Sequence, residues 1–200
     1  MRLLEPASED EVISSFLRAE IDSDRYGEKL RRLLARDRRQ PAVLRHPDLA
    51  DDCENRYRRV LLDEHRGYER REEMFGGFPR KIDWFRAALG VEEVLDILYI
   101  NWDWWLTLSG GSRSPRDAAR RIRNGLCPGV TAEGHESVAK ALRTGVAPEV
   151  IAVTTPAHTP LVVVEGHVRL TAYALFPQYL RPETEILLGV SEKITRWWAY

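Results

Sequence analysis

The chain has 200 residues, a formal net charge of −1 at pH 7, 44% hydrophobic residues and 30% charged residues. This composition is typical of one globular domain, or of one compact domain with a helical extension. The near-zero charge argues against nucleic acid as a partner. No apolar run reaches membrane-spanning length, and the N-terminal segment becomes acidic too early for a signal peptide. We therefore expect a cytoplasmic protein without a membrane partner.

The two cysteines, Cys53 and Cys127, are far apart in the sequence. They form neither a C-x-x-C motif nor a Cys/His ladder. A chain of this size does not need a disulfide, so a reducing compartment fits the cysteine content better than an oxidising one.

Apolar residues at helical spacing predict helices over 9–20, with Ser8 as N-cap, and over 27–36. A long helical segment follows over 51–74, and Gly67 is expected to kink or break it. The outer face of the 27–36 helix is rich in arginine. It is either a basic patch for phosphates or a solvated helix face.

The strongest predicted helix covers 91–108, where apolar residues recur at steps of three and four. Asn101 and Trp104 lie off this apolar stripe, one turn apart and on a common side. The two residues are therefore candidate substrate-binding residues. The alternative is ordinary packing with a hydrogen-bonded amide.

A Gly-Gly turn follows, and Ser114 is expected to cap a helix over 115–124. Ser112 and Arg113 offer a hydroxyl and a guanidinium group to a phosphate or carboxylate. The segment does not match the phosphate-binding loop that ends in Gly-Lys-Ser/Thr. A plain connection between two helices is therefore the alternative.

The composition changes after residue 145, beyond a predicted helix over 132–142. Three strands are predicted, over 149–154, 160–164 and 185–189. Ser191 is expected to cap a final short helix. The sequence thus predicts an α+β fold, in which a mainly helical portion, 1–145, packs on a small mixed sheet with flanking helices, 146–200. We expect the two portions to form one compact unit.

The segment 160–176 reads PLVVVEGHVRLTAYALF, a buried strand that ends at a glycine and opens a helix. The first N–H groups of such a helix have no intrahelical partner, and the helix dipole attracts anions to them. Glu165, His167 and Arg169 add a base, an imidazole and a fixed cation at the same turn. The alternative is structural: an i,i+4 ion pair between Glu165 and Arg169, with His167 as a further capping group.

The sequence PEVIAVTTPAHTPLVVVEGHVRLTAYAL resembles the ParB/sulfiredoxin-like superfamily, in which a strand pair leads into a Gly-containing turn at a helix N-terminus. Relatives include the CTP-binding domain of ParB proteins, sulfiredoxin and a free serine kinase. The resemblance covers residues 146–190. The helical portion is similar to that of a bacterial family with the same EGH-x-R-x-x-A signature, and brings no activity with it.

The resemblance implies a nucleotide such as ATP, usually with Mg²⁺, bound at the start of the late helix. Gly166, His167 and Arg169 would contact phosphate, and Glu165 would be the metal ligand or the base. Ser112 and Arg113 would reach in from the helical portion. The sulfiredoxin cysteine is missing after the glycine, which excludes sulfinic-acid repair. The DNA-binding region of ParB has no counterpart after residue 190, so centromere binding is not expected.

The expected function is nucleotide-dependent phosphotransfer to a small hydroxyl-bearing molecule, by a kinase or NTPase that relies on positioning and charge neutralisation. Glu165, His167 and Arg169 are the candidate catalytic residues. Two alternatives stay open. One is a nucleotide-binding switch without catalysis, and the other is a DNA-associated or nuclease-like protein of the ParB type.

Overall fold

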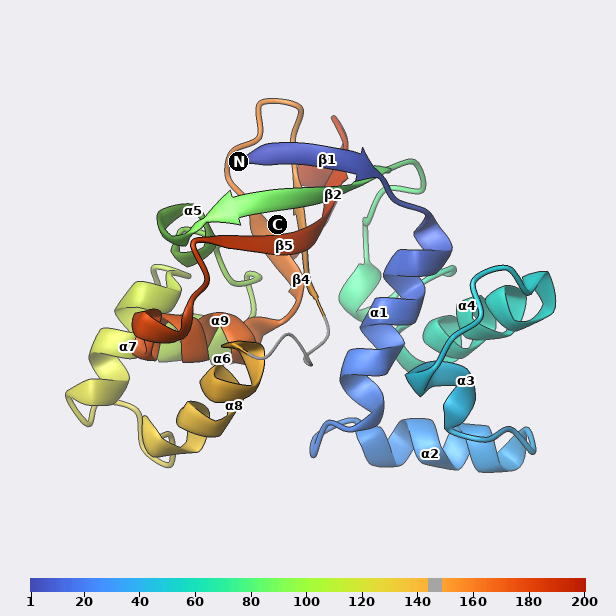
Figure 1. Cartoon of the computed structure of the whole chain (residues 1–200), viewed down its shortest axis with the longest axis horizontal. Coiled ribbons are helices and arrows are strands. Elements are labelled where there is room, and N and C mark those ends of the chain that lie inside the picture. Colours follow the sequence, from blue (N-terminus) through green and yellow to red (C-terminus); the bar gives the residue numbers. More distant parts are fainter. Residues whose placement is uncertain (144–148) are drawn as a thin grey trace. The chain divides into compact units, whose positions relative to one another are not determined.

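The structure is a computed structural model that describes residues 1–143 and 149–200 (Figure 1). It is an α+β protein, as the sequence predicted. The chain forms two compact units. The helical unit is Ala7–Phe78, and the sheet unit combines Met1–Pro6 with Pro79–Tyr200.

The helical unit contains four α-helices and a 3-10 turn: α1 Glu9–Ile21, α2 Gly27–Arg36, α3 Ala42–Arg45, α4 Asp52–Arg66 and η1 Glu73–Phe75. The Ser8 side chain caps α1, as predicted, by accepting a hydrogen bond from the Glu11 N–H. Gly67 ends α4 in a left-handed conformation with φ 74°. The expected break at Gly67 is therefore confirmed, whereas the continuation of this helix to residue 74 is wrong.

Apolar faces of α1, α2 and α4 supply most of the buried residues of the helical unit. Phe16, Leu17 and Leu30 are buried, as the helical spacing predicted. After α4 ends, aromatic residues continue the core, because Phe75 packs edge-on against Tyr68 with ring centroids 4.9 Å apart.

Within its described residues, the sheet unit contains one mixed sheet of five strands in the order β1-β2-β5-β3-β4. Among these strands, β3 and β5 pair in parallel and the other neighbours pair antiparallel. The strands are β1 Arg2–Pro6, β2 Asp83–Gly90, β3 Val150–Thr154, β4 Val162–Glu165 and β5 Glu183–Val190. The sequence predicted β3, β4 and β5 but missed β1 and β2, because β1 is short and exposed and β2 contains no β-branched residue.

Helices flank this sheet, and Figure 1 shows α6 to α9 gathered on one side of it. They are α5 Val91–Leu95, α6 Asp103–Ser109, α7 Pro115–Arg123, α8 Glu133–Arg143 and α9 His167–Leu175, followed by the 3-10 turns η2 Pro177–Tyr179 and η3 Ile194–Arg196. Alternate strand residues, including Ala152 and Leu188, form one apolar cluster with Leu170 of α9. This cluster fixes α9 against the sheet.

The predicted helix over 91–108 is wrong, because residues 96–102 are not helical. The N–H of Leu98 donates to the carbonyl of Leu161 at 2.9 Å, and the N–H of Val163 donates to the carbonyl of Leu98 at 2.9 Å. The segment thus pairs with the outer edge of β4. Pairing with a distant strand outweighs the local helical pattern here, and the predicted final helix is likewise only the 3-10 turn η3.

The helical unit lies in the sequence between β1 and β2, which pair with each other. The two units therefore begin and end at other positions than the expected portions 1–145 and 146–200. The expected boundary itself falls in residues 144–148, outside the described residues. Among the described helices, none is both long enough and apolar enough to cross a membrane.

Candidate functional site

The turn between β4 and α9 brings together Glu165, Gly166 and Arg169. Gly166 has φ 115°, a conformation that favours glycine, and no side chain caps the helix that follows. The first intrahelical bond runs from the Leu170 N–H to the Gly166 carbonyl at 2.9 Å. The N–H groups of His167, Val168 and Arg169 precede that bond, at the positive end of the helix dipole.

The glycine is also required by its surroundings. A Cβ at residue 166 would lie 3.1 Å from Val150 Cγ2 and 3.3 Å from two guanidinium nitrogens of Arg169. The guanidinium of Arg169 therefore lies directly against the backbone at the start of α9. A fixed cation and the helix N-terminus share one small region.

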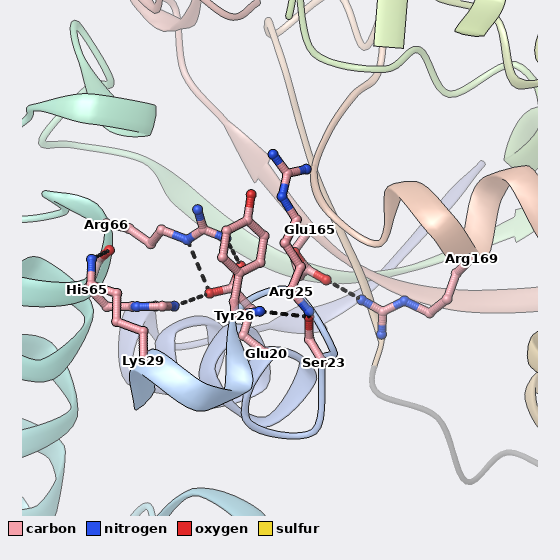
Figure 2. A network of polar contacts seen from close by, with 9 residues as sticks. All are labelled: Glu20, Ser23, Arg25, Tyr26, Lys29, His65, Arg66, Glu165 and Arg169. Atoms are coloured by element: carbon pink, nitrogen blue, oxygen red, sulfur yellow. Dashed lines mark hydrogen bonds and ion pairs between the residues drawn. The ribbon is translucent and has the colours of Figure 1, made fainter. Parts of the chain in front are cut away.

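Glu165 and Arg169 form the ion pair that the structural alternative predicted, with Oε1 and Nη2 3.0 Å apart (Figure 2). The Arg169 side chain is 9% exposed and the Glu165 side chain 21% exposed. Because the pair is largely shielded from water, its attraction is screened less than that of a surface pair. Arg169 is the cation that the sequence assigns to phosphate, and the Glu165 carboxylate already takes up part of its hydrogen-bonding capacity.

His167 is part of an aromatic stack. Its ring is nearly parallel to the ring of Trp105, with centroids 4.8 Å apart, and the residue is 8% exposed. Tyr99 lies 6.2 Å from the imidazole, and its hydroxyl is hydrogen-bonded to Thr171 Oγ1 at 2.6 Å. Burial raises the pKa of Tyr99, so the phenol stays protonated. The packing holds the imidazole against rings of neighbouring segments.

Ser112 and Arg113 hydrogen-bond to the backbone instead of to the turn. The Ser112 hydroxyl donates to the Ser109 carbonyl at 3.1 Å. The Arg113 guanidinium donates to the carbonyls of Tyr99 at 2.7 Å and Tyr200 at 2.8 Å, and burial lowers its pKa. These bonds direct both side chains to backbone outside the β4–α9 turn. Arg113 joins the 97–102 segment to the C-terminal segment.

Asn101 and Trp104 do not share a helix face, because α6 begins only at Asp103. The prediction of their common side is therefore wrong. The Asn101 N–H donates to the Ala199 carbonyl at 2.9 Å, and the Trp104 side chain is exposed. The sequence also missed a contact between the exposed rings of Trp102 and Trp198, whose centroids lie 5.4 Å apart. No local pattern could have indicated that pairing across almost a hundred residues.

The turn alone does not supply a full set of Mg²⁺ ligands. No group of three or more His, Cys, Asp or Glu side chains that could hold a metal occurs in 1–143 and 149–200. The turn offers the single carboxylate of Glu165, which is bound to Arg169. Mg²⁺ prefers several oxygen ligands. Backbone N–H groups beside a guanidinium instead suit an anion.

The helical unit has a polar cluster of its own, which the sequence pattern did not reveal (Figure 2). Glu20 accepts hydrogen bonds from His65 Nε2 at 2.5 Å and from Arg66 Nε at 3.1 Å. The Arg66 guanidinium lies over the Tyr26 ring, 3.4 Å from its centroid. Burial raises the pKa of Glu20, but the hydrogen bonds from His65 and Arg66 outweigh it, so the net pKa is lowered.

This cluster joins three helices. Glu20 belongs to α1, His65 and Arg66 belong to α4, and Lys29 of α2 donates to the His65 carbonyl at 2.7 Å. The Glu20 side chain is only 3% exposed and the His65 side chain 0%. Groups so enclosed cannot reach a dissolved substrate, and their role is to hold the helices together.

No family model matches the chain, and neither does any curated protein or solved structure.

Proposed function

We propose that the sheet unit binds a nucleotide, whose phosphates lie against the start of α9. The observation that carries the proposal is the contact of the Arg169 guanidinium with the backbone at Gly166, where a Cβ would lie within 3.3 Å of two guanidinium nitrogens. A fixed cation, a glycine without a side chain and the first N–H groups of a helix are the components of a phosphate site.

Each component has a separate task. Gly166 lets a phosphate oxygen approach the backbone, because no side chain intervenes. The N–H groups of Val168 and Arg169 offer hydrogen bonds, strengthened by the helix dipole. The Arg169 guanidinium can grip two oxygens at once. His167 would contribute its backbone N–H, because its ring packs on Trp105.

The start of α9 is not closed by a side-chain cap. Ser8, Asp51 and Ser114 cap α1, α4 and α7 with side-chain oxygens, which accept hydrogen bonds from the first N–H groups. α2 and α6 also lack such a cap, so this feature agrees with the proposal without distinguishing α9 from them. Resemblance of this segment to the ParB/sulfiredoxin-like superfamily points to a nucleotide in particular.

Phosphotransfer to a small hydroxyl-bearing molecule stays a prediction. It requires a carboxylate that serves as a base or that helps to position Mg²⁺ with the phosphates. Glu165 is the carboxylate at this turn, and it is bound to Arg169. The geometry of the turn therefore supports phosphate binding more than phosphate transfer.

A thermal-shift panel tests the proposal. Inorganic triphosphate, ATP, CTP, GTP and UTP are each added with and without Mg²⁺. Saturating ligand should raise the melting temperature by about 5–10 °C, because a ligand at about 100 times its Kd adds about 2.7 kcal/mol. Arg169→Lys, which keeps the charge but loses the planar fork, should at least halve the shift.

Arg2→Lys is the matched control, because Arg2 forms an ion pair with Glu183 at 3.1 Å on β1, the edge strand opposite β4. This variant should keep the full shift. The proposal is wrong if no phosphate compound raises the melting temperature. A full shift in Arg169→Lys would also place the ligand somewhere else.

A further inference from the structure

The carboxylate of Glu165 accepts a hydrogen bond from the Arg169 guanidinium, which the proposed phosphate would also need. Its Oε1 lies 3.0 Å from Arg169 Nη2. Arginine recognises carboxylate and phosphate by the same charge-assisted hydrogen bonds. Glu165 is therefore an internal anion in the position of an external one.

We propose that this ion pair is autoinhibitory, so that Glu165 and an incoming phosphate compete for Arg169. This inference rests on the nucleotide-binding function proposed above and adds its regulation. Binding exchanges one anion for another at the guanidinium. The apparent affinity is then the intrinsic affinity reduced by the stability of the internal pair.

The geometry allows this exchange without a change of fold. Glu165 is the last residue of β4, and Arg169 lies in the first turn of α9, so the sheet and the helix fix both backbones. Glu165 is the more exposed partner, at 21% against 9%, so it is the side chain that can turn towards water at the lower desolvation cost.

The inference opposes the other role expected for Glu165, as a Mg²⁺ ligand or a base. The two roles predict opposite signs for Glu165→Gln, which keeps the shape of the side chain and removes its charge. A competing carboxylate weakens phosphate binding, so its neutralisation should strengthen binding. A metal-binding carboxylate would strengthen binding in the presence of Mg²⁺, so its neutralisation should weaken it.

The experiment measures the Kd for inorganic triphosphate and for ATP by calorimetry, each with and without Mg²⁺. We expect Glu165→Gln to lower both Kd values about fivefold, since loss of a partly shielded pair is typically worth such a factor. Glu136→Gln is the control, because Glu136 forms an i,i+4 pair with Lys140 at 2.9 Å on the exposed face of α8 and carries the same charge change. It should leave both constants unchanged.

Each outcome decides one question. An unchanged or higher Kd in Glu165→Gln overturns autoinhibition, and a rise seen only with Mg²⁺ assigns Glu165 to the metal. If Glu165→Gln gives either of these results but Arg169→Lys still weakens phosphate binding, the proposed phosphate site still stands. If the wild type, with its melting temperature confirmed, binds no phosphate compound at all, the proposed function itself fails. Combining Glu165→Gln with Arg169→Lys should give a smaller gain than Glu165→Gln alone.

Discussion

Each unit of the protein contains a shielded carboxylate bound to arginine, and the two differ in enclosure. In the helical unit, Glu20 is 3% exposed and accepts hydrogen bonds from both His65 and Arg66. In the sheet unit, Glu165, the last residue of β4, is 21% exposed and pairs with Arg169 in the first turn of α9. The first carboxylate joins separate helices, whereas the second joins residues four apart. Tight enclosure suits a structural contact, and partial exposure suits one that can be exchanged.

This comparison predicts that an enclosed carboxylate such as Glu20 contributes more to stability than an exposed one. Glu20→Ala leaves His65 and Arg66 buried without their shared carboxylate. The free energy of unfolding of the helical unit should fall by about 4 kcal/mol, because an uncompensated buried charge is costly. Urea denaturation followed by circular dichroism measures the change.

Glu64→Gln is the control for that experiment. Glu64 pairs with Arg36 on the exposed surface of the same unit, and its loss should cost about 0.5 kcal/mol. Equal effects from the Glu20 and Glu64 variants would show that enclosure does not determine how much a carboxylate contributes to stability.

Acid should weaken the helical unit for the same reason. The folded state lowers the pKa of Glu20 below its ordinary value of 4.5. A lowered carboxylate pKa contributes stability that is present above pH 4.5 and is lost as the pH falls through the folded value. Urea midpoints of the wild type should therefore decrease as the pH falls below about 4.5.

The Glu20→Gln variant isolates this contribution, because the amide does not titrate. Its midpoint should start lower at neutral pH and should depend less on pH in the same acidic range. If its pH dependence matches that of the wild type, other carboxylates account for the acid sensitivity.

The elements that local sequence determines were predicted well, and those that depend on distant partners were not. Ser8, Ser114 and Gly67 marked helix ends correctly, because caps act within one turn. Residues 96–102 were assigned to a helix, since their apolar spacing does not reveal the backbone bonds between Leu98 and β4. Strand pairing over long sequence separations decides such segments.

The same distinction applies to the candidate site. The positions of Glu165, Gly166 and Arg169 follow from a strand, a glycine and a helix in direct succession, and the i,i+4 pair was one of the two interpretations of that sequence. The stack of Trp105 on His167 could not be predicted, because it depends on where the irregular 97–102 segment places α6. Arg113 binds carbonyls of that segment and of the C-terminal residues for the same reason.

The Gly166→Ala variant separates the cost of backbone strain from the cost of close packing. Gly166 has φ 115° and neighbours at 3.1 and 3.3 Å, whereas Gly111 has φ 92° and no atom within 4 Å of its would-be Cβ. Both alanine variants meet strain from the positive φ, which costs about 1 kcal/mol. Only Gly166→Ala should add a further cost of about 1 kcal/mol, because the methyl group displaces Val150 or the Arg169 guanidinium.

The measurements are the urea midpoint and the Kd for inorganic triphosphate of each variant. Gly111→Ala should lose stability but keep its affinity, whereas Gly166→Ala should lose both, because the methyl group fills the space through which a phosphate oxygen approaches the backbone. If Gly166→Ala kept the wild-type affinity, the contact between Arg169 and the glycine would be packing alone. The internal pair of Glu165 and Arg169 would then be a structural contact, like the one that Glu20 makes in the helical unit.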